Sequence, residues 1–133
     1  MSEHSRNRSF GSLLAAGATM AMGSDWPVST PDPWQAIHVA VNRTYPAYPD
    51  APPLLPEQAI SLQTALSSYT AGSAWLNRND DGGAIAVGKA ADLVVLNADP
   101  FRLDPGELHT VGTDFTMIAG VPVYTGQPQE AKA

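Results

Sequence analysis

The chain has 133 residues, of which 44% are apolar, so its length and composition are those of a globular domain with a buried core. Seven basic and thirteen acidic residues give a formal net charge of −6, which argues against a nucleic-acid partner or an anionic membrane surface. The absence of cysteine excludes disulfides, thiolate nucleophiles and cysteine-ligated zinc.

The N-terminal part of the chain predicts a helix, a strand and a carboxylate, in that order. Residues 1–9 are polar and predict a loop or a frayed end. The apolar spacing from Phe10 predicts a short helix that Gly17 closes. Residues 18–22 are a small apolar run without polar alternation, which indicates a strand buried on both faces. Asp25 follows this run, and the C-terminal end of a parallel barrel strand is where catalytic groups lie.

A proline-rich middle segment separates two predicted helices. Asp32 as N-cap and Pro33 as first helical residue predict a helix over about 33–43. Ser61 is a good N-cap for the strongest predicted helix, which covers 61–76 and has an apolar face. The loop between them, residues 44–55, has the length of a lid or rim of a site, although a surface connection is the more common role of such a loop.

The last third of the chain changes to a strand pattern. Three short apolar runs bounded by turn residues predict strands at 91–97, 115–118 and 122–125. Residues 83–126 therefore predict a β-rich unit that is distinct from the helical middle. The polar tail at 127–133 is predicted to be disordered.

No local pattern in the chain matches a common catalytic or metal-binding motif. His4, His38 and His109 form no H-x-H, H-x-x-x-H or H-E-x-x-H pattern, so none has the local spacing of a zinc site. The glycines lack the spacing of a phosphate-binding loop, and no serine stands in a G-x-S-x-G turn. Asp25 remains as a candidate. From pattern alone it is either a catalytic carboxylate at a strand end or a carboxylate that forms a turn or caps a helix.

Several motifs, taken in their order along the chain, resemble the end of a metal-dependent amidohydrolase. They are G-S-D-W-P-V at 23–28, D-P-W at 32–34, A-V-N-R at 40–43, A-L-S-S-Y-T-A-G-S-A at 65–74, G-K-A-A-D-L-V-V-L at 88–96, I-A-G at 118–120 and V-Y at 123–124. The branch that these motifs resemble is amidohydrolase family 3, which includes the N-substituted formamide deformylase-like enzymes. The resemblance covers residues 9–126, nearly the whole chain.

The resemblance implies an α/β fold in which this chain is the C-terminal fragment of a distorted (β/α)8 TIM barrel plus part of a small β-sandwich. Residues 1–82 would be the end of the barrel, with its last strand at 18–24 and helices at about 33–43 and 61–76. Residues 83–126 would be the C-terminal share of the sandwich. Because a complete barrel needs about 250 residues, the chain would be a truncated gene product, a split-gene product or a domain fragment.

The resemblance also implies that Asp25 is the catalytic general base and a neighbour or ligand of a divalent metal, with zinc as the expected ion. The parent enzyme would use a metal-activated water to hydrolyse a C–N bond other than a peptide bond, in a small amide-like substrate. A catalytic zinc needs about three protein ligands, and the family's H-x-H pair and later histidines have no counterpart here. We therefore expect weak metal binding and no turnover without the missing N-terminal barrel portion. We expect no nucleic-acid partner and no membrane, and a cytoplasmic location.

Two other interpretations stay open at the level of sequence. The chain could be a catalytically inactive fragment that acts as a binding or scaffold module. In addition, Arg6 and Arg8 followed by an apolar stretch loosely resemble an export signal, which would make the chain a small secreted protein with a cleaved N-terminus.

Overall fold

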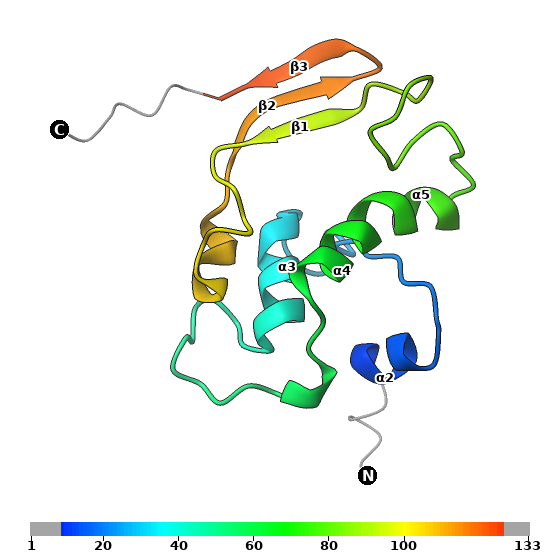
Figure 1. Ribbon diagram of the computed structural model, residues 1–133. Helices are drawn as coiled ribbons and strands as arrows, with labels where there is room; N and C mark the ends of the chain where they lie inside the picture. The colour runs from blue at the N-terminus through cyan, green and yellow to red at the C-terminus, as the bar shows by residue number, and fades with distance from the viewer. Residues whose placement is uncertain (1–8, 127–133) are drawn as a thin grey trace, which may run out of the picture.

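The computed structural model describes residues 9–126 as a helical part and a three-stranded sheet (Figure 1). The helices are α2 (Phe10–Ala15), α3 (Pro33–Asn42), α4 (Leu62–Ser67) and α5 (Ser73–Leu76). The strands are β1 (Leu93–Leu96), β2 (Thr113–Ile118) and β3 (Val121–Thr125), and short helical turns are η1 (Pro56–Gln58), η2 (Ser68–Gly72) and η3 (Pro105–Thr110). The fold is thus mixed α/β. The tail predicted to be disordered, at 127–133, lies outside the described residues.

Helix α3 begins at a capping residue and is followed by a residue with positive φ. The Asp32 side chain accepts a hydrogen bond from the Trp34 backbone N–H at 2.9 Å, and Pro33 is the first helical residue. The last helical residue is Asn42, and the φ of 58° at Arg43 breaks the helical path. One face of the helix is buried, and that face includes the imidazole of His38.

The predicted helix over 61–76 is a helical run in three pieces. Ser61 caps α4, and its hydroxyl oxygen accepts a hydrogen bond from the Thr64 N–H at 3.1 Å. Residues 68–72 then form a wider π turn, η2, before α5 begins. A π turn often marks a functional site within a helix. The sequence predicts the helical run but not this interruption.

The segment predicted as a strand, residues 18–24, lies outside any helix or strand. A strand needs a hydrogen-bonded partner strand, and the described sheet contains β1, β2 and β3 without this segment. It is held instead by the helical run. The Met22 N–H donates to the Ser68 carbonyl oxygen at 3.0 Å, and the Ser73 hydroxyl donates to the Met22 carbonyl oxygen at 2.7 Å. These bonds fix the backbone that leads to Asp25.

The core lies where α3 meets α4 and the residues around η3. Its buried apolar members are Trp34, Ile37, Ala40, Ile60, Ala65 and Val111. Leu108 of η3 is 1% exposed, and η3 packs against α3 before the chain continues into β2. The interface between α3 and η3 therefore joins the helical part to the sheet.

The sheet has the order β1–β2–β3, and both strand pairs are antiparallel. Leu93 pairs with Met117 across β1 and β2. The tight turn into β3 uses Ala119 and Gly120, both with positive φ. Every residue of β3 is exposed. These strands lie within the β-rich unit predicted over 83–126, while the division of the chain at residue 82 stays a prediction.

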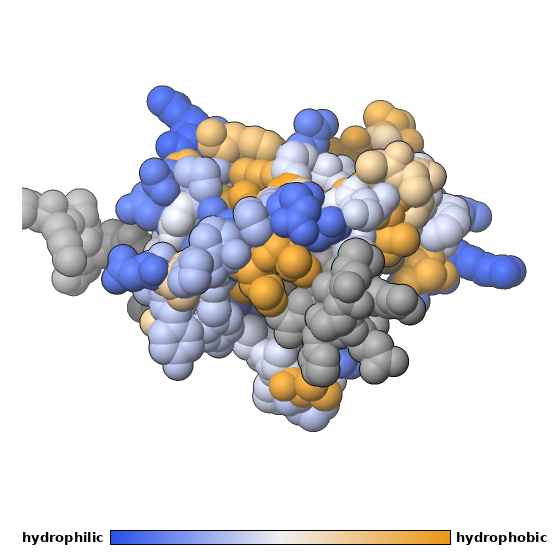
Figure 2. Space-filling model, turned by 90° about the horizontal axis from the view of Figure 1, so that it is seen from below, coloured by the Kyte–Doolittle hydropathy of each residue, from blue (hydrophilic) through white to orange (hydrophobic). Residues whose placement is uncertain are grey.

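Apolar side chains reach the surface in several places, and Figure 2 shows one such face. Trp26 is 65% exposed, Trp75 is 63% exposed and Ile85 is 90% exposed. Large exposed apolar patches typically mark interaction surfaces. None of the helices in the described part of the chain is long and apolar enough to cross a membrane.

We expect Gly72→Ala to destabilise the protein, because a Cβ at this position would overlap the carbonyl oxygen of Met20. The 18–24 segment would have to move away from η2. Such overpacking costs about 1–3 kcal/mol of unfolding free energy, which urea denaturation measures. Gly23→Ala is the matched control, since no atom lies within 4 Å of a Cβ built there. Equal losses in the two variants would contradict this contact.

Candidate functional site

Asp25 lies at the end of the 18–24 segment in a left-handed backbone conformation. Its φ is 54°, which Asp adopts more readily than most residues. Its backbone carbonyl oxygen accepts a hydrogen bond from the Val28 N–H at 2.8 Å, which closes a turn over Trp26 and Pro27. The side chain is exposed, and no described residue donates a hydrogen bond to its carboxylate. The carboxylate is therefore open to a water molecule or a substrate.

The backbone on both sides of Asp25 is held in place. The Ser29 hydroxyl donates to the Ser24 carbonyl oxygen, which ties the turn back onto the segment. The preceding residues border a small, mostly apolar cavity of about 160 Å³, lined by Phe10, Met20, Ala21, Met22, Gly23, Ala40 and Ile60. Contacts of this kind fix the position of a side chain through its backbone.

The described residues do not form a metal site around Asp25. A catalytic zinc takes about three protein ligands. In residues 9–126, no three His, Cys, Asp or Glu side chains converge in a group that could hold a metal ion. His4 lies outside this range. Asp25 on its own does not fit a resident metal, so such an ion would need ligands from elsewhere.

The structure brings together two histidines that the sequence spacing did not connect. The rings of His38 on α3 and His109 on η3 meet edge to face, with centroids 4.9 Å apart and an interplanar angle of 87°. Both Nδ1 atoms are buried and have no hydrogen-bond partner within residues 9–126. Burial lowers the pKa of His38, and the charge of His109 lowers it further. Asp25 does not join the two rings in a group of three.

Tyr69 is a further polar group that sequence reasoning missed. The pattern placed it on the apolar face of the helical run, where it is half-buried. Its hydroxyl oxygen is buried and has no hydrogen-bond partner in the described part of the chain. Burial raises the pKa of Tyr69, and the negative charge of Asp32 raises it further. In the sequence, the signal for this buried hydroxyl is that a Tyr, rather than a Phe, stands on an apolar helix face.

The proline-rich loop at 44–55 is tied back to the end of α3. The Arg43 carbonyl oxygen accepts a hydrogen bond from the Leu54 N–H at 2.9 Å. The Nε of the Arg43 side chain also donates a hydrogen bond to the Leu54 carbonyl oxygen, at 3.0 Å. Two hydrogen bonds between the same two residues thus close the base of this loop.

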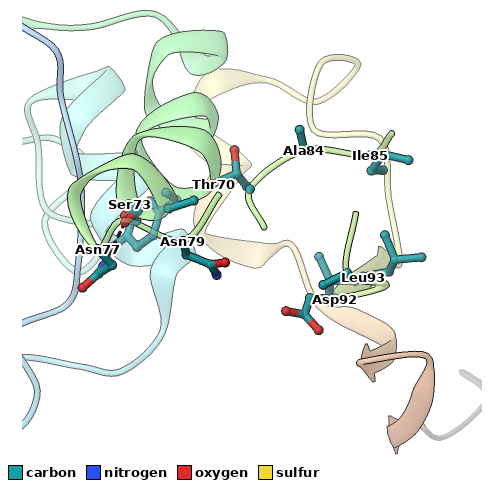
Figure 3. A pocket seen from close by; sticks show the side chains of 13 residues that line it. Thr70, Ser73, Asn77, Asn79, Ala84, Ile85, Asp92 and Leu93 are labelled. Carbon is teal, nitrogen blue, oxygen red and sulfur yellow. Dashed lines mark hydrogen bonds between the residues drawn. The ribbon is translucent and has the colours of Figure 1, made fainter. Parts of the chain in front are cut away.

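An open pocket of about 680 Å³ lies between the helical run and the start of β1, and Asp25 does not line it. Figure 3 shows Ser73 and Asn77 on the helical side and Asp92 on the opposite side. The Asn77 side chain donates to the Ser73 carbonyl oxygen at 2.8 Å, and the Asp92 carboxylate accepts from the Ala119 N–H at 2.7 Å. These polar groups therefore already form hydrogen bonds within the fold.

Comparison with known proteins places the chain in a family. A sequence model described as the amidohydrolase family matches residues 4–124. No solved structure matches the chain.

Three relatives are similar over much of this chain. YtcJ of Bacillus subtilis (strain 168), which is named as an amidohydrolase, is 35% identical over 113 residues, covering 84% of this chain and 21% of YtcJ. The N-substituted formamide deformylase of Arthrobacter pascens is 35% identical over 114 residues, covering 85% of this chain and 20% of the deformylase. The protein LONG AFTER FAR-RED 3 of Arabidopsis thaliana is 38% identical over 93 residues, covering 68% of this chain and 15% of that protein.

The chain spans about a fifth of the length of the first two relatives. The family model covers nearly all of this chain, and its match confirms the family that the sequence motifs resemble. The chain belongs to the amidohydrolase family, in the branch known as amidohydrolase family 3.

Proposed function

We propose that this chain provides the general base of an amidohydrolase that hydrolyses a C–N bond other than a peptide bond. The observation that carries the proposal is the exposed Asp25 carboxylate, which lies in the family match and has no hydrogen-bond donor among residues 9–126. A carboxylate in this position can orient a water molecule and accept its proton as the oxygen attacks a carbonyl carbon. Two hydrogen bonds support the same role, because they hold the backbone that presents Asp25: the Met22 N–H donates to the Ser68 carbonyl oxygen, and the Ser73 hydroxyl donates to the Met22 carbonyl oxygen.

The proposal includes a structural partner. The first two relatives are about five times longer than the matched segment, and a complete (β/α)8 barrel needs about 250 residues. We propose that residues 18–24 serve as the last strand of such a barrel and that an N-terminal barrel portion supplies its neighbours. A divalent metal, with zinc as the expected ion, would then take its other ligands from that portion.

The proposed substrate is a small amide-like molecule. N-substituted formamides are the first class to test, because one relative that covers most of this chain is named for their deformylation. Hydrolysis of such a compound yields formate and an amine, and both products can be measured.

Asp25→Asn is expected to abolish most of this activity in a complete enzyme. The enzyme is built by placing residues 9–126 into the Arthrobacter pascens deformylase in place of its matching segment. Because Asn cannot accept the proton of the attacking water, kcat for amine release should fall about 10²–10⁴-fold. Asp50→Asn, which changes an exposed carboxylate in the 44–55 loop, is the matched control.

Two results would count against the proposed role. One is an Asp25→Asn chimera that keeps the kcat of its parent. The other is a chimera that melts cooperatively but hydrolyses no formamide even with Asp25 intact. The second result would favour the alternative function, a binding or scaffold module without chemistry.

Ser73→Ala is expected to lower both stability and kcat, because it removes the hydrogen bond to the Met22 carbonyl oxygen. Losing this part-buried hydrogen bond costs about 0.5–1.5 kcal/mol, measurable by urea denaturation. KM should change less than kcat, since Ser73 acts through the position of Asp25. Ser67→Ala is the control because Ser67 is exposed and lies six residues earlier in the same helical run; the same losses in both variants would show a general helix effect.

A further inference from the structure

We propose that the contact between His38 and His109 is a pH-sensitive joint, which holds η3 against α3 while the buried His38 imidazole is neutral and releases it when His38 is protonated. The proposal concerns the interface that links the helical part to the sheet. It does not depend on Asp25 or on any hydrolytic activity.

The geometry suits two neutral rings. An edge-to-face arrangement places the positive edge of one ring on the negative face of the other, which is attractive, and the two centroids are 4.9 Å apart. His38 is 3% exposed. In an imidazolium both ring nitrogens are donors, so Nδ1 must then carry a hydrogen. For both rings this atom is buried without an acceptor among the described residues, and a buried charged donor without an acceptor is strongly unfavourable.

The surrounding elements offer little to compensate such a charge. Helix α4, which packs on α3, carries no titratable side chain. The titratable groups of α3, its caps, η2, η3 and the η3 cap, apart from the two histidines, are Asp32, Arg43, Tyr69, Asp104 and Glu107. The Asp32 and Asp104 carboxylates already accept hydrogen bonds from backbone N–H groups at the starts of α3 and η3. Glu107 is exposed, and the buried Arg43 adds positive charge at the end of α3. Two protonated rings would therefore mainly repel each other.

The pKa of His38 gives the direction of the pH dependence. Burial, and then the charge of His109, hold this pKa below its ordinary value of 6.5 in the folded protein. As the pH falls through 6.5, the unfolded or opened chain therefore binds more protons than the closed protein. The contribution of His38 to stability is complete above this pH and is lost progressively below it. Each pH unit within that window lowers the ratio of closed to open protein by up to about tenfold.

The opening should be local. The Asn42 side chain donates to the Pro105 carbonyl oxygen at 2.7 Å, and this bond joins the end of α3 to the start of η3 without a titratable group. Separation of His38 from His109 would thus swing η3 about Pro105 and expose Leu108. Because η3 leads directly into β2, the sheet would loosen from the helices.

Hydrogen exchange of the unmodified chain, read by mass spectrometry, tests the joint. Protection is compared at about pH 7.5 and about pH 5.5, on either side of the ordinary histidine pKa, and corrected for intrinsic exchange rates. We expect peptides that cover 105–113 to lose up to about tenfold of their protection at the lower pH. Peptides from α4 and α5 should lose much less. An equal loss throughout the chain, or no loss at 105–113, would overturn the proposal.

Two variants assign the effect to the histidine pair. His109→Phe keeps a ring against His38 but removes one of the two charges, so the loss of protection at low pH should shrink. His4→Gln removes the third histidine and should behave like the unmodified chain. Should His109→Phe fail to fold, proton NMR of the unmodified chain decides, because the proposal requires His38 to titrate below 6.5. Titration at or above that value would overturn it.

Discussion

The position of Asp25 depends on a close contact between two backbones. The carbonyl oxygen of Met20 lies where a side chain on Gly72 would be, so this glycine is what lets the 18–24 segment approach the helical run. The π turn then brings the Ser68 carbonyl oxygen and the Ser73 hydroxyl to Met22. Because Asp25 has no side-chain hydrogen bond of its own among residues 9–126, it is positioned through its backbone. This contact holds the segment before Asp25, and the hydrogen bonds from the Val28 N–H and the Ser29 hydroxyl hold the turn after it.

Elements defined by short-range chemistry could be predicted from the sequence. Asp32 and Ser61 both cap helices through the hydrogen bonds that their residue types favour. The strands also lie close to the apolar runs that predict them, because alternation and turn residues act within a few positions. The π turn escaped this reasoning, because the apolar pattern of residues 61–76 is that of an uninterrupted helix. In the structure this turn is where the helical run contacts the 18–24 segment.

The 18–24 segment shows why a pattern can identify a residue set without fixing its structure. Its small apolar residues suit a strand with neighbours on both sides, yet the described residues provide a helical surface in place of partner strands. The candidate site also contains features that a sequence pattern predicts and features that it does not. Asp25 could be singled out from its place in a family motif, whereas the contact of His38 with His109 and the buried hydroxyl of Tyr69 arise from residues distant in sequence.

The length of the 44–55 loop does not affect the rest of the fold, because the base of this loop is closed. Both ends are fixed by the two hydrogen bonds between Arg43 and Leu54. Each doubling of a flexible loop costs only about 0.6 kcal/mol in closure entropy. Residues can therefore be inserted or lost between these two positions while α3 and its core contacts stay unchanged. The composition of this segment, like its length, is thereby separated from the packing of the core beneath it.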